Sequence, residues 1–452
     1  MFSENKQSPT SWGRYPKVKS KQVVPLFWRS ELPDLASFDG SVLPYGYGRS
    51  YGDSCLNDSG VTLDASRLTN FIAFDDQEGL LKCEAGVSLA NVLELAVPRG
   101  WFLPVSPGTK FVSVGGAIAN DVHGKNHHSA GTFGCHVTQF ELLRSTGEHI
   151  ICSPTQNPEL FRATIGGLGL TGIIIWAEFR LKRIVNPYID TVSVRFESLD
   201  EFFDLSAEFE PQYEYSVSWV DMLIGEPNTC RGKFSAGNNN QDPDLAKKPL
   251  KKSKLPLSIP FDLSPALTVN PLSLKAFNEL YYHVQVQKRV EKTSSYEPFF
   301  YPLDSIHDWN RMYGSRGFFQ YQFVIPFEDG RNGMRSIMRF IAKNDEGSFL
   351  NVLKEFGTRK SPGMLSFPRP GVNLAIDFAN RGPRTLRFLD KLDRVVEDSG
   401  GAFYPAKDAR MSSASFKKCY SEWDEFQKYI DPKFSSTFWR RVTGEEKSPV
   451  LV

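Results

Sequence analysis

The sequence predicts an α+β protein built from two unlike parts. Residues 40–185 are dense in glycine, short β-rich runs and turn signals, whereas the chain after Pro187 carries longer amphipathic segments with many aromatic residues. A chain of 452 residues, 40% of them hydrophobic, is also long enough for two domains and a large core. We therefore expect a domain boundary at Pro187.

Caps and turns predict the elements of the first part in order. A strand and a turn precede Ser88, which is a typical N-cap for a helix that Gly100 ends. Residues 136–154 predict two strands joined by a short turn. A helix over 158–165, a glycine-rich turn and an apolar strand over 172–181 follow.

Composition excludes several classes of protein. With 53 basic and 52 acidic side chains the net charge is +1, which gives no electrostatic footprint for binding duplex nucleic acid. The first residues lack the apolar core of a signal peptide, and the most apolar stretch, Ile165–Trp176, is too short to span a bilayer. The six cysteines are widely spaced without a CxxC pair. We expect a cytoplasmic protein with reduced, mostly structural cysteines.

The segment Pro44–Ser54 is the first of two glycine-bearing segments with the residue types of an anion site. Gly46, Gly48 and Gly52 leave backbone N–H groups unobstructed by Cβ atoms, as a diphosphate cradle requires, and Arg49 would complement the negative charge. Such a loop alone is weak support, because most short glycine-rich turns are only turns.

The second glycine-bearing segment follows Pro107-Gly108-Thr109. A strand-like FVSV run enters a helix through Gly115 and Gly116, so we expect free N–H groups at the helix start to face an anion. Two separate segments of this kind indicate a dinucleotide. Two tight turns in a layer of small residues remain the structural alternative.

Two other sites are weighed and set aside. Residues 167–172 satisfy GxGxxG, but a predicted helix precedes them and a strand follows, which is the reverse of a nicotinamide-binding Rossmann unit. We instead expect this turn to pack against whatever the glycine segments hold. His123, His127 and His128 match no zinc spacing and have no carboxylate or cysteine beside them in sequence, so we expect no metal.

Five motifs together carry a resemblance to a known family: GYGRSYGDS, PGTKFVSVGGAIANDVHGKNHHSAGTFG, GGLGLTGII, FFQYQFVIPF and FYPAKDAR. The chain from about residue 40 onward resembles the vanillyl-alcohol-oxidase (PCMH-type) superfamily of FAD enzymes. The run 123–131 (HGKNHHSAG) is similar to the branch that oxidises polyprenyl-phosphoryl ribose.

The resemblance implies an architecture and a set of site residues. Residues 1–187 would form a two-subdomain FAD-binding domain, 188–401 a substrate-binding domain built on an antiparallel sheet, and 402–452 a segment returning to the FAD domain. By motif match, the residues that would contact FAD are Pro44, Gly46, Gly48, Arg49, Ser50, Tyr51, Gly52, Asp53, Ser54, Gly108, Ser113, Val114, Gly115, Gly116, Asn120, Asp121, Val122, His123, Ile175 and Tyr404. The residues that would bind substrate are Gln320, Gln322, Lys354, Asn373 and Lys407, and those that would serve catalysis are Lys407, His123 and Tyr51. Without the resemblance, Lys407 would read as an exposed lysine at a strand end.

Two positions decide how far the family's chemistry carries over. Related oxidases often attach FAD covalently through a histidine where this chain has Tyr51, so the resemblance implies a dissociable, non-covalent FAD. Better-known members carry a cysteine beside the flavin where this chain has Ala375. That cysteine cannot be required for turnover if this protein is active.

The reaction that the resemblance implies is oxidation of the 2′-hydroxyl of a polyprenyl-phosphoryl ribose to a ketone, which a separate short-chain reductase reduces to the arabinose epimer. Two alternatives stay open: an FAD oxidase of a soluble sugar, alditol or aldonolactone, and a scaffold subunit without activity. The lysine-rich run 237–256, next to the apolar LPLSIPFDL, suggests a peripheral membrane contact at the inner face, although a solvated, disordered loop is the commoner explanation of such a run.

Overall fold

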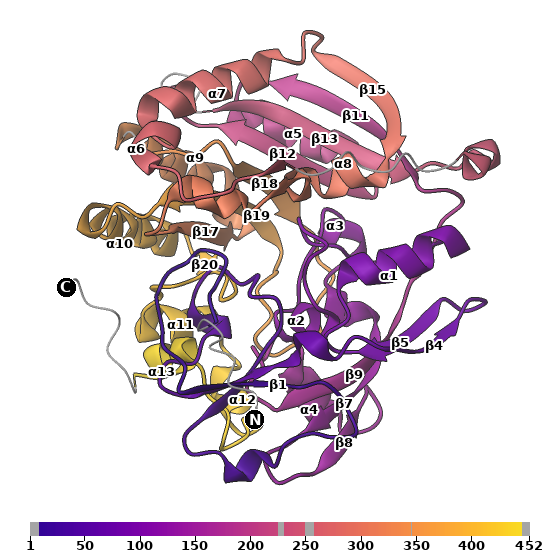
Figure 1. Ribbon diagram of the computed structural model, residues 1–452. Helices are drawn as coiled ribbons and strands as arrows, with labels where there is room; N and C mark the ends of the chain where they lie inside the picture. Colours follow the sequence, from indigo (N-terminus) through magenta and orange to yellow (C-terminus); the bar gives the residue numbers. More distant parts are fainter. Residues whose placement is uncertain (1–8, 225–229, 249–256, 345, 445–452) are drawn as a thin grey trace.

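Three larger β-sheets and the helices packed on them make up most of the computed structural model, which describes residues 9–224, 230–248, 257–344 and 346–444 (Figure 1). In Figure 1 the N-terminal half occupies the lower part of the molecule and the largest sheet lies above it, with the C-terminal helices beside the N-terminal sheets. The chain forms both helices and strands, as expected for an α+β protein, and the sheets of five and eight strands are antiparallel.

Two sheets form the N-terminal half. The smaller one is parallel, in the order β1-β3-β2, with β1 at Gln22–Pro25, β2 at Val42–Tyr45 and β3 at Val61–Asp64. The larger one has the order β4-β5-β9-β7-β8, with β4 at Phe71–Asp75, β5 at Leu80–Glu84, β7 at Val137–Leu143, β8 at His149–Cys152 and β9 at Ile173–Arg180. The helices of the N-terminal half are α1 at Leu89–Ala96, α2 at Val114–Ala119, α3 at His127–Ala130 and α4 at Pro158–Thr164. A separate two-stranded pair is formed by β6 at Trp101–Phe102 and β10 at Lys182–Arg183.

The local signals read from the sequence explain several of these elements. Ser88 caps α1, because its Oγ accepts from the N–H of Asn91 at 3.1 Å, and Gly100 ends the following turn with φ +78°. The predicted hairpin, helix and apolar strand are β7–β8, α4 and β9. The predicted strand at FVSV is reduced to a single antiparallel β-bridge between Ser113 and Ser88, because α2 already begins at Val114.

The eight-stranded sheet has the order β15-β11-β13-β12-β18-β19-β17-β20. Its strands are β11 at Tyr188–Phe196, β12 at Tyr215–Asp221, β13 at Arg231–Asn239, β15 at Arg289–Ser295, β17 at Phe318–Ile325, β18 at Asn351–Phe356, β19 at Gly371–Ala379 and β20 at Ala402–Phe403. One face packs against α5 at Leu199–Phe209, α9 at Phe327–Lys343 and α10 at Pro383–Asp398 in a continuous apolar core. The other face turns toward the N-terminal half.

The remaining elements connect these sheets. They are β14 at Leu257–Ser258, α6 at Pro265–Thr268, α7 at Pro271–His283, α8 at Tyr296–Phe300 and β16 at Ile306–His307, followed near the C-terminus by α11 at Ser413–Cys419, α12 at Trp423–Gln427 and α13 at Thr437–Thr443. The C-terminal helices contact the N-terminal half: the N–H of Val42 donates to the carbonyl of Lys433 at 2.8 Å, and Arg441 pairs with the buried Asp53 at 2.7 Å.

All six cysteines are free, and four of them are buried. Within the described ranges, none of the helices has the length and apolar character needed to cross a membrane. Of the lysine-rich run, Lys251, Lys252 and Lys254 lie outside the described residues.

Candidate active site

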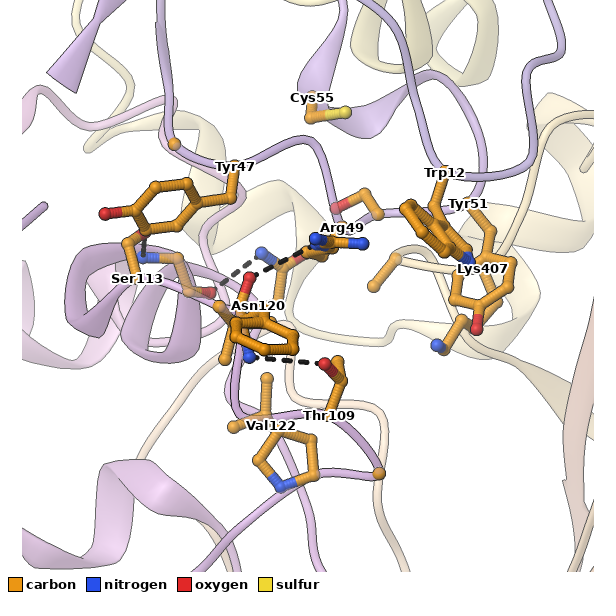
Figure 2. Close-up of a pocket in the computed structure, with 18 of the residues that line it drawn as sticks. Trp12, Tyr47, Arg49, Tyr51, Cys55, Thr109, Ser113, Asn120, Val122 and Lys407 are labelled. Carbon is orange, nitrogen blue, oxygen red and sulfur yellow. Dashed lines mark hydrogen bonds between the residues drawn. The ribbon is translucent and has the colours of Figure 1, made fainter. Parts of the chain in front are cut away.

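A cavity of about 520 Å³ lies between the N-terminal half and the inner face of the eight-stranded sheet. Both glycine-bearing segments line it, together with β12, β17, β18 and β19 of the sheet and the loop that carries Tyr404 and Lys407. Its volume falls within the range of sites for small ligands and cofactors. Figure 2 shows Tyr47 of the first segment beside Ser113 of the second on one side, with Trp12, Tyr51 and Lys407 grouped at the other.

The first segment presents free backbone donors to this cavity. The N–H groups of residues 47–50 donate to no acceptor among the described residues, whereas the N–H of Tyr51 is held by the carbonyl of Ala406 at 2.8 Å. Gly48 has φ +61°, and a Cβ there would lie 2.1 Å from the Tyr45 hydroxyl, so only glycine fits. The Arg49 guanidinium lies 4.1 Å from the centre of the Trp12 ring, which fixes it at the cavity wall.

The second segment corrects the expectation of free N–H groups at a helix start. Ser113 caps α2, but its Oγ accepts from the N–H of Gly116 at 3.1 Å, and the preceding two N–H groups donate to the carbonyls of Val87 and Ala85. The first turn of α2 therefore has no donor left for an anion. The two segments do meet, since a Cβ on Gly46 would lie 2.5 Å from Ser113 Oγ.

Polar atoms without partners point to a bound group in the same region. The Oγ of Ser54 and the Oδ1 of Asn120 are buried and have no hydrogen-bond partner within the described part of the chain, although both residues line the cavity. Gly108 also lines the cavity, and a Cβ added to it would meet no other described atom within 4 Å. Buried polar atoms are seldom left unpaired in native proteins, so these positions favour a polar ligand.

The sheet contributes a polar face because side chains alternate along each strand. Gln320 and Gln322 of β17, Lys354 of β18 and Asn373 of β19 line the cavity, while their neighbours Tyr321, Leu353 and Leu374 enter the core. Ala375 also lines the cavity, paired in register with Gln322 on one side and Val352 on the other. The register thus brings together every substrate residue that the resemblance implied on the sheet.

His123 is held between two of these sheet residues. Its Nε2 lies 2.9 Å from Gln322 Nε2 and its Nδ1 lies 3.0 Å from Lys354 Nζ. Burial and the neighbouring Lys354 lower the pKa of His123 well below its usual value, so the imidazole is neutral. The amide nitrogen of Gln322 can only donate, so His123 Nε2 accepts from it, and the N–H of the neutral ring is at Nδ1, facing Lys354 Nζ.

Lys407 reaches the cavity from the loop after β20. Loss of hydration lowers the pKa of Lys407 to about 7, and the nearby Asp377 carboxylate opposes that shift. Asp377 is buried on β19, where its Oδ1 accepts from Gln320 Nε2 at 2.8 Å and burial raises its own pKa to about 7. The charge of each group therefore opposes the effect of burial on the pKa of the other.

Two further lysines make the cavity electropositive. Burial lowers the pKa of Lys354 to about 7, with a contribution from the charge of Lys125, and burial alone lowers the pKa of Lys125 to about 8. Within the described residues, the hydrogen-bond partners of Lys354 Nζ are neutral, namely His123 Nδ1 and the carbonyl of Gly124. In their protonated forms these lysines favour an anionic ligand, because neither is paired with a carboxylate among the described residues.

Five residues expected at FAD do not line the cavity: Gly52, Asp53, Val114, Asp121 and Ile175. The Asp53 carboxylate is buried in an ion pair with Arg441, and the Asp121 carboxylate accepts from the N–H of Gly134 at 2.9 Å and from two serines. Val114 and Ile175 are core residues, and a Cβ on Gly52 would overlap the Asp408 backbone. Among lining residues that sequence reasoning did not single out are Trp12, Lys125, Asp304 and His307.

His127 and His128 do not join His123 as ligands. Both nitrogens of His127 are buried without a partner among the described residues, and its ring lies 4.5 Å from that of Phe356. The Nε2 of His128 lies 2.9 Å from the carbonyl of Tyr213. The part of the chain that the structure describes contains no cluster of histidine, cysteine and carboxylate side chains able to hold a metal ion.

Comparisons with known proteins agree with this geometry. The FAD binding domain family matches residues 32–153. The chain is 38% identical over 413 residues to decaprenylphosphoryl-beta-D-ribose oxidase of Mycolicibacterium smegmatis, covering 89% of each protein. It is 32% identical over 378 residues to an uncharacterized protein in the mprA 5′ region of Streptomyces coelicolor, covering 79% of this chain and 100% of that protein. A putative D-arabinono-1,4-lactone oxidase of Neurospora crassa is 32% identical over 136 residues, only 30% of this chain and 24% of that protein.

The fold, the cavity and the family match together define an FAD-dependent oxidoreductase. The free N–H groups of residues 47–50 and the unpaired Ser54 and Asn120 oxygens fit the polar parts of that cofactor. Within the flavoproteins of the vanillyl-alcohol-oxidase type, the chain belongs to the family of decaprenylphosphoryl-beta-D-ribose oxidase.

Proposed function

We propose that this protein oxidises the 2′-hydroxyl of a polyprenyl-phosphoryl ribose to the 2′-ketone. The observation that carries the proposal is the 38% identity over 89% of the chain, because a match of that length includes the sheet that lines the cavity as well as the FAD-binding part. The match to the lactone oxidase covers too little of the chain to support a soluble sugar as the substrate.

Lys407 is the group that we propose to take the hydroxyl proton. Bound FAD supplies a two-electron acceptor for the hydride that leaves C2′. The O–H bond must lose its proton in the same oxidation, and a lysine with a pKa of about 7 is partly neutral at physiological pH and can accept it. Neutral His123 and the amides of Gln322 and Asn373 are placed to orient the sugar hydroxyls through hydrogen bonds.

Lys354 and Lys125 are the groups that we propose to hold the phosphodiester. Lys125, with a pKa of about 8, is mostly protonated at neutral pH, and Lys354, with a pKa of about 7, is partly protonated. Both line the cavity, and neither forms an ion pair with a carboxylate among the described residues. An anionic ligand would also raise the pKa of each lysine toward its usual value, so binding and protonation favour one another.

We also propose how the chain is divided between these tasks. Residues 1–187 hold FAD, with the three-stranded and five-stranded sheets as two subdomains, and residues 188–401 cover the substrate. Residues 402–452 return to the FAD part, which the pairing of Asp53 with Arg441 and the bond between Val42 and Lys433 support. A separate short-chain reductase would convert the ketone to the arabinose epimer.

The test is an absorbance spectrum of the yellow holoenzyme, taken without oxygen before and after addition of a short-chain polyprenyl-phosphoryl ribose. We expect the flavin band at about 450 nm to bleach. Bleaching by free sugars or lactones, with none by the lipid-phosphate sugar, would replace this proposal by the soluble-sugar oxidase. Acid precipitation of the same sample should release the flavin into the supernatant, because Tyr51 cannot form a histidyl link to it.

A further inference from the structure

Helix α7 presents apolar side chains to the surface. Leu272, Leu280 and Val284, at the helix and its end, have 80%, 67% and 69% of their surface exposed. The buried side of the same helix includes a polar residue, Asn278, whose Nδ2 donates to Asp221 Oδ1 at 2.9 Å. The buried side also holds Leu274 and Tyr282, so α7 carries apolar side chains on both sides, and the exposed ones are suited to another apolar environment.

The exposed apolar residues continue into the neighbouring elements. Leu267 of α6 is 77% exposed, Leu257 of β14 is 75% exposed, and Phe261 and Val286 are also exposed. Of the fifteen large hydrophobic side chains exposed in the described residues, nine lie within the single segment 257–286. We call the part of this segment formed by Leu267, Leu272, Phe277, Leu280, Tyr281 and Val284 the α6–α7 face.

The charges around the α6–α7 face do not oppose an anionic surface. The segment 257–286 contains two carboxylates, and both are paired: Asp262 with Arg14 at 2.5 Å, and Glu279 with Arg231 and with His283. Lys275 and His283 add basic groups along α7. With both carboxylates paired and Lys275 in the same segment, the segment does not repel an anionic leaflet.

The same segment packs against residues that form part of the cavity wall. Ile306 and His307 line the cavity as β16, and they pair with Leu257 and Ser258 of β14. The hydroxyl of Thr268 in α6 donates to the carbonyl of Met312 at 2.7 Å, next to Trp309 on the cavity wall. One apolar cluster, which includes Leu274, Trp309 and Ile306, underlies both surfaces.

We propose that the α6–α7 face docks on the surface of a lipid bilayer, so that the cavity receives the head group of a substrate whose polyprenyl tail stays in the membrane. This inference rests on the proposed function, because a polyprenyl substrate is held in a bilayer and must be delivered from it. Docking through a segment that packs directly against the cavity wall shortens that transfer. Interfacial helices bind in this manner by inserting one apolar face at the head-group level.

The test compares two triple variants of the full-length holoenzyme. Leu272→Ser/Leu280→Ser/Val284→Ser removes the α6–α7 face, and Phe27→Ser/Val185→Ser/Phe327→Ser removes three exposed apolar side chains elsewhere. Each protein is sedimented with substrate-free vesicles of phosphatidylethanolamine and phosphatidylglycerol. We expect the first variant to lose about tenfold or more in vesicle partitioning and the control to bind as the wild type does. The flavin spectrum and thermal midpoint of both variants should match the wild type, since the substituted side chains are exposed.

Turnover separates this inference from the proposed function. With a water-soluble short-chain substrate both variants should be fully active, whereas with long-chain substrate embedded in vesicles only the first should be impaired. Equal vesicle binding by all three proteins would overturn the inference. The inference would also be overturned if the wild type did not bind vesicles but formed a dimer that the first variant abolished. A second copy of the chain would then cover the α6–α7 face. Vesicle binding without flavin reduction by the ribose substrate would overturn the proposed function alone.

Discussion

The Nζ of Lys407 lies 3.7 Å from the centre of the Tyr51 ring, which joins the last part of the chain to the first glycine-bearing segment at the edge of the cavity. Tyr51 is held there by its N–H bond to Ala406, one residue before Lys407. An aromatic face favours the lysine ammonium, whereas loss of hydration disfavours it. The balance leaves Lys407 able to change protonation state near neutral pH.

Replacing Lys407 by methionine should separate FAD binding from chemistry. Methionine keeps most of the side-chain volume and loses the proton acceptor, so we expect the yellow colour to remain and the rate of flavin reduction to fall about 10²-fold to 10⁴-fold. Anaerobic stopped-flow reduction measures this rate. Lys407→Arg is the control for charge, and it should also be slow because a guanidinium does not lose its proton. Full-speed reduction in the methionine variant would remove Lys407 from the proton transfer.

The rate of flavin reduction should depend on pH through Lys407. The neutral amine is the form that accepts a proton, so the rate should be low at acid pH and rise through the pKa of about 7. Asp377→Asn should move this rise to lower pH, because removing the carboxylate removes the charge that raises the pKa of Lys407. Asparagine can still accept from Gln320, so the side-chain position is preserved. A pH profile identical to that of the wild type would reduce Asp377 to a structural residue.

The buried pair of Arg441 and Asp53 should contribute strongly to stability. Both side chains are almost fully removed from solvent, and Arg441 also bonds Asp408 at 2.8 Å, directly after Lys407. Arg441→Met leaves two carboxylates without their cation, which should cost about 3–5 kcal/mol of unfolding free energy. Denaturant titration of the holoenzyme measures it. Lys428→Ala, which breaks an exposed pair with Glu425, should change stability by about 1 kcal/mol or less.

The sequence predicts those parts of the site whose structure depends on residues that are neighbours in the chain. The caps of α1 and α2 and the two glycine-bearing segments are set by neighbouring residues, and β17 is identifiable because Gln320 and Gln322 interrupt an apolar run. The role of the first turn of α2 was mistaken, because Ala85 and Val87 occupy its N–H groups through a contact that no local pattern reveals.

The roles of Asp53 and Asp377 both depend on contacts with residues that are distant in the sequence. Asp53 lies inside the first glycine-bearing motif and yet pairs with a residue 388 positions later, so its carboxylate is unavailable to the cavity. Asp377 was not singled out, although a carboxylate within the otherwise buried strand β19 is a signal in itself. Its importance depends on Lys407, which only the folded chain brings near.

Position 375 should accept a cysteine and thereby gain sensitivity to thiol reagents. Ala375 lies on the cavity wall between Gln322 and Val352, so Ala375→Cys adds a thiol without displacing the core. We expect turnover within about twofold of wild type, since the alanine protein needs no group there. Iodoacetamide should then inactivate the variant and spare the wild type, because burial raises the pKa of Cys55, which also lines the cavity, to about 12 and keeps it protonated. Substrate present during alkylation should protect the variant. Equal inactivation of both proteins would show that alkylation of another cysteine causes the loss of activity. Resistance of both proteins would show that a thiol at position 375 is not accessible to the reagent.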